Sequence, residues 1–106
     1  MKPSEILEVV AAFCDEEALK ADGFDEACIG IANVFGEKGR RTVLAYDYGR
    51  MSDLLVERDG MSYEDAEEYL DFNVLGAYVG EGTPVYIEFI PRKPHIVRKK
   101  KAVANA

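Results

Sequence analysis

The side chains best suited to chemistry in this chain are carboxylates that flank its predicted strands. Clustered carboxylates can hold a cation, act as a general base or receive a basic side chain. Each carboxylate also has a local use, in a turn, as a helix cap or in a solvated loop, so both interpretations stay open. The candidates at predicted turns are Asp22, Asp25, Glu26, Asp47 and Glu81.

Familiar catalytic and metal-binding patterns are mostly absent from the sequence. His95 is the only histidine, so no Ser/His/Asp, Cys/His or His-rich zinc arrangement can be assembled around the body of the chain. Cys14 and Cys28 do not have a zinc spacing, and "ADGFDEACIG" lacks the residue order of a calcium loop. We therefore expect no metal or cofactor, and we favour a binding protein over an enzyme.

Hydrophobic spacing predicts one α+β domain over residues 1–90, with the order α-β-β-α-α-β and a three-stranded sheet. Strands at 27–35 and 41–46 form a hairpin around "GEKG", and "PVYIEFI" is the third strand. The third strand is expected beside the second, antiparallel, or beside the first, parallel. Either order brings the turns with the five carboxylates to one rim of the sheet, where Asn73 and Thr83 complete a predicted rim site.

Three helices are expected to cover this sheet. Ser4 is the predicted N-cap of the first helix, whose stripe of Ile6, Val9, Val10 and Phe13 should face the core. Asp47 should cap the second helix, Gly60 should end it, and Ser62 should begin the third.

The third helix has two contrasting faces. Its predicted apolar stripe consists of Tyr63, Ala66, Tyr69, Leu70, Asn73, Val74 and Ala77. The opposite, acidic face consists of Glu64, Asp65, Glu67, Glu68 and Asp71. Acids on such a face suit a solvated helix, and they could also meet a basic partner.

Charge is divided unevenly along the chain. The formal net charge is −7, yet residues 91–106 contain six Lys and Arg and no acid. This basic tail is predicted to be disordered, and it could contact nucleic acid or lie on its own body. No run approaches the ~18 apolar residues of a membrane span. We expect no membrane partner and a cytoplasmic protein of a bacterial or phage-infected cell.

Small residues on the first predicted strand favour close approach by another backbone. Cys28, Gly30 and Ala32 point to one face of that strand and offer little side-chain bulk. A helix of the same chain or a second copy could lie there, so a homodimer is among the expected partners.

Two sequence blocks resemble a family of small uncharacterised proteins from tailed phages and bacteria. They are "ADGFDEACIG" with "AYDY", and "LLVERDGMSYEDAEEYLDFNVLGAYVGEGTP". The shared pattern spans about residues 21–85 and runs D-G-F-[DE]-[DE]-A, then R-D-G-M-S-Y-E-[DE]-A, then F-N-V-x-G-A-[YW]-V-G-E-x-T-P. The first helix and the basic tail lie outside it, and Gly49 departs from it. The resemblance implies a phage or prophage context and supplies no reaction.

Three functions follow as hypotheses. The first is a non-enzymatic interaction protein whose acidic body docks on a basic surface of a host or defence protein. The second is a small-ligand or cation-binding protein that uses the rim site. The third is a nucleic-acid-associated protein that contacts phosphate through residues 92–101.

Overall fold

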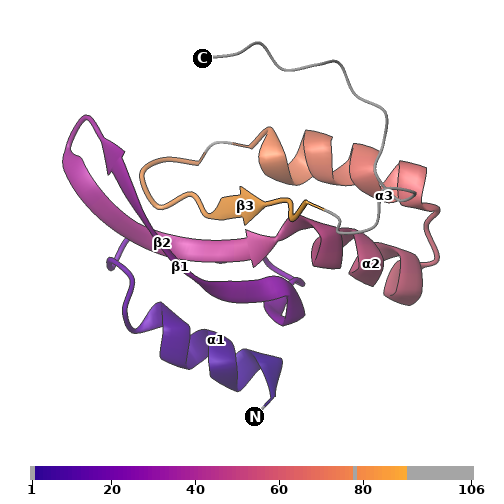
Figure 1. The fold of residues 1–106 in the computed structure, drawn as a ribbon, viewed down its shortest axis with the longest axis horizontal. Helices are drawn as coiled ribbons and strands as arrows, with labels where there is room; N and C mark the ends of the chain where they lie inside the picture. The colour runs from indigo at the N-terminus through magenta and orange to yellow at the C-terminus, as the bar shows by residue number, and fades with distance from the viewer. Residues whose placement is uncertain (1, 78, 91–106) are drawn as a thin grey trace.

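The structure is a computed structural model in which residues 2–77 and 79–90 are described. The described residues confirm the α+β class, with three α-helices and a three-stranded mixed sheet (Figure 1). The basic tail, predicted to be disordered, lies outside the described residues. The elements in chain order are α1 (Pro3–Ala11), the 3-10 turn η1 (Asp25–Ala27), β1 (Cys28–Gly36), β2 (Gly39–Asp47), α2 (Tyr48–Asp59), α3 (Tyr63–Leu70), the π-helical turn η2 (Asp71–Leu75) and β3 (Val85–Ile87).

The sheet has the order β1-β2-β3 within the described residues. β1 and β2 pair antiparallel as the predicted hairpin, while β3 pairs with β2 in parallel, with Val85 opposite Ala45. The expected place beside the second strand is confirmed but its antiparallel direction is wrong, and the alternative place beside the first strand is also wrong. After η2 the chain runs back along β2, where the Leu19 amide donates to the Gly82 carbonyl (3.0 Å), and only then turns into β3. β3 thus pairs with the last three residues of β2, Ala45 to Asp47, and follows its direction.

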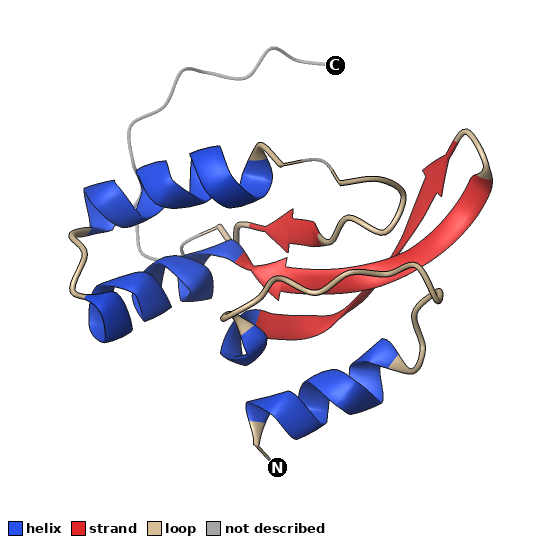
Figure 2. Cartoon of the chain, turned by 180° about the vertical axis from the view of Figure 1, so that it is seen from behind, coloured by secondary structure: helices blue, strands red, loops and turns tan. Residues whose placement is uncertain are grey.

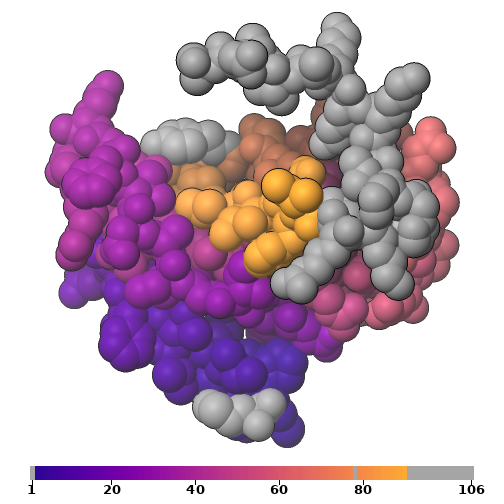
Figure 3. Space-filling model, in the orientation of Figure 1, coloured from indigo at the N-terminus to yellow at the C-terminus, as the bar shows by residue number. Residues whose placement is uncertain are grey.

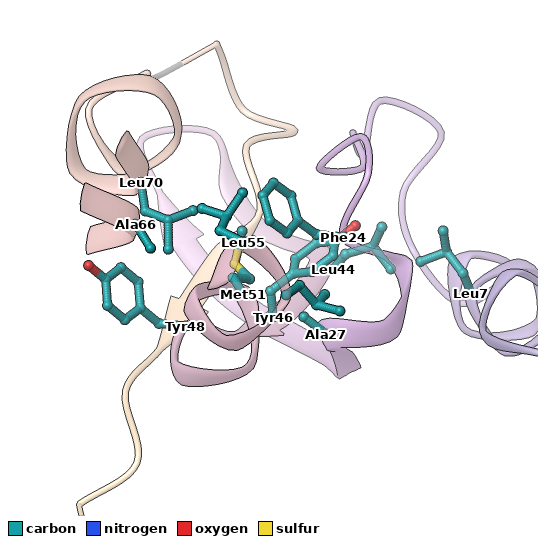
Figure 4. Close-up of a cluster of buried hydrophobic side chains, with 11 residues drawn as sticks. Leu7, Phe24, Ala27, Leu44, Tyr46, Tyr48, Met51, Leu55, Ala66 and Leu70 are labelled. Atoms are coloured by element: carbon teal, nitrogen blue, oxygen red, sulfur yellow. The ribbon is translucent and has the colours of Figure 1, made fainter. Parts of the chain in front are cut away.

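The core lies where α2 and α3 pack against the end of the sheet (Figures 1 and 4). Tyr46 of β2 is completely buried and its ring stacks on Tyr86 of β3, with 6.0 Å between ring centroids. Met51 of α2 and Leu70 of α3 are also fully buried. The segment between α1 and η1 crosses the sheet toward η1, and the Ala21 amide donates to the Tyr46 hydroxyl at 2.9 Å (Figure 2).

The first helix differs from its prediction. Lys2, not Ser4, is the N-cap residue, and its side chain makes no capping hydrogen bond. Leu7 is the buried residue of α1, whereas Ile6, Val9 and Phe13 are 42%, 52% and 70% exposed. The reason is geometric, because this short helix rests on one line of side chains, Leu7, Val10 and Cys14, instead of the predicted stripe.

The caps predicted for α2 and α3 are confirmed. The Arg50 amide donates to Asp47 Oδ1 at 3.2 Å, and the Asp65 amide donates to Ser62 Oγ at 3.1 Å. Gly60 follows α2 with a φ of 73°, the left-handed conformation that glycine adopts at least cost. These contacts place both helices at the positions expected from their spacing.

The apolar stripe of the third helix is narrower than predicted. Ala66 and Leu70 are buried and Val74 is half-buried, but Tyr63, Tyr69, Asn73 and Ala77 are exposed. The helix widens at η2, where the Gly76 amide donates to the Asp71 carbonyl five residues earlier (3.0 Å). A π turn holds one residue more than an α turn, so it rotates the following side chains away from an α-helical stripe.

No described helix combines the length and apolar character that crossing a membrane requires.

Candidate functional site

Arg50 of α2 contacts two of the predicted rim carboxylates, one through its side chain and one through its backbone amide. Arg50 donates through Nη2 to Glu26 Oε2 at 3.2 Å, while its backbone amide donates to Asp47 Oδ1. Its Nη1 also reaches Glu57 Oε2 at 3.3 Å. The positive charge that a partner could bring to Glu26 is therefore already supplied by Arg50 of α2, and Asp47 is occupied as a helix cap.

Asp22 lies on the adjoining loop and faces water. Its side chain is 92% exposed, and its carboxylate is 4.0 Å from the Lys20 ammonium. The loop itself is fixed by Arg58, whose Nη1 donates to the Gly23 carbonyl at 2.7 Å and whose guanidinium lies 5.8 Å from the Phe24 ring centroid. The exposed ion pair between Lys20 and Asp22 contributes little to stability.

Glu81 and Thr83 do not join the rim, so the prediction that all these turns converge is wrong. Glu81 pairs with Arg41 near the hairpin tip, with 2.7 Å between Oε2 and Nη1. The Thr83 hydroxyl donates to the Gly80 carbonyl (2.7 Å) and accepts from the Val79 amide (3.0 Å). The cause is the return of the chain along β2, which carries residues 80–83 toward the hairpin tip.

Asn73 also lies outside the rim. Its side chain is exposed, and Nδ2 donates to the Tyr69 carbonyl at 3.1 Å. The buried position expected for this amide is wrong because of the π turn. Asn73 therefore has a local helical partner and no contact with a sheet rim.

Asp25 differs from Glu26, Asp47 and Glu81, because no described residue donates a hydrogen bond to its carboxylate. Its Oδ1 is shielded from water and has no hydrogen-bond partner, and no described residue donates to the other oxygen. A shielded carboxylate oxygen without a donor costs free energy. Within the described residues, no three His, Cys, Asp or Glu side chains are placed to hold a metal ion together.

The acidic face of α3 is presented to solvent much as the sequence predicted. Glu64, Asp65, Glu68 and Asp71 are exposed and Glu67 is half-buried. Among the described residues, no Lys or Arg forms an ion pair with Glu64, Asp65 or Glu68. Asp71 accepts a hydrogen bond from the Tyr48 hydroxyl at 3.0 Å, which ties the end of α3 to α2.

Exposed aromatic side chains accompany these acids, and sequence reasoning placed two of them in the core. Tyr63 and Tyr69 are 54% and 41% exposed, and Phe72 in the π turn is 78% exposed. The Tyr63 hydroxyl donates to Asp53 Oδ1 at 3.1 Å, and this hydrogen bond raises the pKa of Tyr63. Phe72 follows Glu68 by four residues, so α-helical spacing places its ring on the same exposed face as the acids.

Comparison of the chain with protein-family models, with curated proteins and with solved structures gives no significant match. The relationship to small phage and bacterial proteins therefore stays a prediction.

Proposed function

We propose that this chain is a non-enzymatic interaction protein that docks the acidic face of α3 on a basic surface of another protein. The proposal rests on one exposed surface that combines acids with large aromatic rings, Phe72 above all. Of these acids, Glu64, Asp65 and Glu68 form no ion pair with a described Lys or Arg. Protein interfaces combine aromatic anchors with a charged rim. Acids steer a basic partner toward the surface, and the rings supply apolar contact once it arrives.

The predicted phage or prophage context indicates which partner to expect. In such a cell, the partner would be a host or defence protein whose surface presents Lys and Arg. The acidic charge of the body opposes direct contact with a phosphate backbone, which favours a protein partner for this surface. The nucleic-acid hypothesis rests on residues 92–101, outside the described residues.

The rim hypothesis receives less support from the geometry. Arg50 already neutralises Glu26, Asp47 is a helix cap, and Glu81 lies near the hairpin tip with Arg41. A cation at this rim would compete with a guanidinium of the same chain. We therefore place the acidic face of α3 ahead of the rim.

Capture of partners from a bacterial lysate tests the proposal. The wild-type chain should retain a basic protein at about 0.1 M salt and release it at about 0.5 M, because salt screens exposed charges. Glu64→Gln/Glu68→Gln should reduce the captured amount several-fold, and Phe72→Ser should reduce it at both salt concentrations. Mass spectrometry of the retained protein identifies the partner.

The matched control is Glu5→Gln/Glu37→Gln, which removes the same charge from exposed positions on α1 and the hairpin turn. This control should capture as much partner as the wild type. Equal losses from both double variants would show a general charge effect and refute a specific α3 interface.

A further inference from the structure

A cleft separates α1 from the segment that follows it. Its volume is about 510 Å³, and its lining comes from α1, from residues 14–16, 18 and 20 of the following segment, and from Asp25 and Leu44. Small-molecule sites usually occupy ~300–1,000 Å³. α1 and α3 lie on separate parts of the surface, so the cleft is distinct from the acidic face of α3 (Figures 1 and 3).

The floor of the cleft is apolar. Leu7 and Leu44 line it and are only 5% and 2% exposed, and Ala11 and Cys14 lie beside them. Figure 4 shows Leu7 on α1, standing apart from the other labelled core side chains. Burial raises the pKa of the Cys14 thiol, so at neutral pH this group is an uncharged, polarisable part of the wall. An aliphatic chain fits this surface.

The rim of the cleft is acidic. Glu8, Asp15, Glu16 and Asp25 line it against the single ammonium of Lys20. Asp15 is held in place, because its Oδ2 accepts from the Thr42 amide at 3.0 Å. Asp25 differs, since its Oδ1 is shielded from water and its carboxylate receives no hydrogen bond from a described residue. Because Oδ1 is shielded, a cationic donor in the cleft would approach the carboxylate at its other oxygen, and its positive charge would offset the cost of the unpaired negative charge.

We propose that this cleft binds an aliphatic ammonium group, with its N–H donors toward the Asp25 carboxylate and its methylene groups on Leu7 and Leu44. The shape, the apolar floor and the unmet carboxylate point to this one chemistry. Two sources offer it, a free alkyl amine and a lysine side chain. The inference stands independently of the proposed docking of α3.

Three matched probes test the chemistry on the 106-residue chain. Hexylammonium carries charge and N–H donors, hexyltrimethylammonium carries charge alone, and 1-hexanol carries neither charge nor an ammonium group. In NMR titrations, hexylammonium should shift the amides of Leu7, Cys14 and Asp25, and it should bind at least about tenfold more tightly than the other two. Equal affinity for hexylammonium and 1-hexanol would overturn the proposal.

Two variants locate the site. Asp25→Asn should weaken hexylammonium binding at least about tenfold while leaving the melting temperature unchanged or higher, because it removes a poorly satisfied charge. Ala11→Met narrows the cleft without changing charge and should weaken binding too, which keeps the test valid if Asp25→Asn does not fold. The control Asp22→Asn alters an exposed carboxylate in the same loop, outside the cleft, and should bind as the wild type does.

Unchanged affinity in both Asp25→Asn and Ala11→Met would refute the site, and so would an equal loss in Asp22→Asn. Titration with 1,5-diaminopentane and with the methylamide of N-acetyl-lysine distinguishes the two sources of the ammonium group. Tighter binding of the first supports a free amine as ligand, and tighter binding of the second supports a lysine side chain.

Discussion

Gly82 joins the loop before β3 to the segment after α1. A Cβ at this position would overlap the Glu17 carbonyl oxygen, and it would also lie 2.8 Å from the Glu17 carbonyl carbon. Both are backbone atoms, so the clash cannot be relieved by turning a flexible side chain. The close approach allows the Gly82 carbonyl to accept from the Leu19 amide, and it fixes where β3 begins.

We predict that Gly82→Ala lowers the free energy of unfolding by about 2 kcal/mol or more, because the two segments must separate. Gly49→Ala is the matched control. Its Cβ would meet Asp47 Oδ1 at 3.4 Å, an ordinary contact, and alanine favours the first turn of α2. The free energy of unfolding of this control should rise by up to about 1 kcal/mol. Urea unfolding of both variants measures the difference, and equal stabilities would contradict the role of Gly82.

Tyr46 links stability to pH at the alkaline end. Burial raises the pKa of its hydroxyl to about 12, whereas an unfolded tyrosine titrates near ~10. The folded state therefore holds the proton more tightly than the unfolded state. This contribution is complete below pH ~10 and is lost as the pH rises through the folded pKa.

We predict that the free energy of unfolding falls more steeply with pH above pH ~10 in the wild type than in Tyr46→Phe. The variant should also be less stable at neutral pH, because the Ala21 amide loses its acceptor. Guanidinium unfolding across the alkaline range measures both effects. Parallel pH profiles for the two proteins would rule out Tyr46 as the titrating group.

At the scale of elements, α1 and β2 have opposite environments. β2 is the central strand of the described sheet, and Thr42, Val43, Leu44, Ala45 and Tyr46 are all buried. α1 has Leu7 as its buried residue and Val10 as a half-buried neighbour. Local opening requires loss of local contacts, so α1 should open much more easily than β2.

We predict that amide hydrogens of α1 exchange with solvent at least about a hundredfold faster than those of Thr42–Tyr46. Leu7→Ala should accelerate exchange in α1 further and leave β2 less affected, since the substitution removes the main anchor of the helix. NMR-detected exchange measures both. Protection of α1 equal to that of β2 would mean that the helix and the sheet unfold as one unit.

The elements that could be predicted from sequence are those specified by neighbouring residues. The β1–β2 hairpin and the caps at Asp47, Gly60 and Ser62 follow from local patterns, and each is observed. The parallel direction of β3 could not be predicted, because Arg41–Glu81 and Leu19–Gly82 direct the preceding loop from far along the chain. The spacing of neighbouring residues does not indicate contacts between segments that are far apart in the sequence.

The candidate sites divide in the same way. The acidic face of α3 follows from helical spacing and is exposed as expected. Phe72 follows Glu68 by four residues, so the same spacing places its exposed ring on that face, although sequence reasoning did not name it as a site residue. The cleft beside Asp25 depends on how α1 rests on the sheet, so only Asp25 itself, as one acid among several, could be named from sequence.

At the scale of the whole molecule, the buried core and the basic charge lie in different parts of the chain. The buried cluster of the described residues runs from Leu7 to Leu70, with Tyr86 packed against it. Residues 91–106 carry six basic residues and no acid. The fold and the charge balance should therefore respond separately to removal of the tail.

We predict that deletion of 91–106 changes the melting temperature by less than about 3 °C at moderate salt, because the described core is left intact. The deletion moves the formal net charge from −7 to −13, so self-repulsion of the acidic body should lower the melting temperature at low salt. Partner capture through α3 should persist, and increase at low salt, because a more negative body attracts a basic surface more strongly. Calorimetry at two salt concentrations, together with lysate capture, separates the two effects. A large loss of stability at moderate salt would show that the tail contributes to the folded core. A loss of capture would show that the partner binds the tail and not α3.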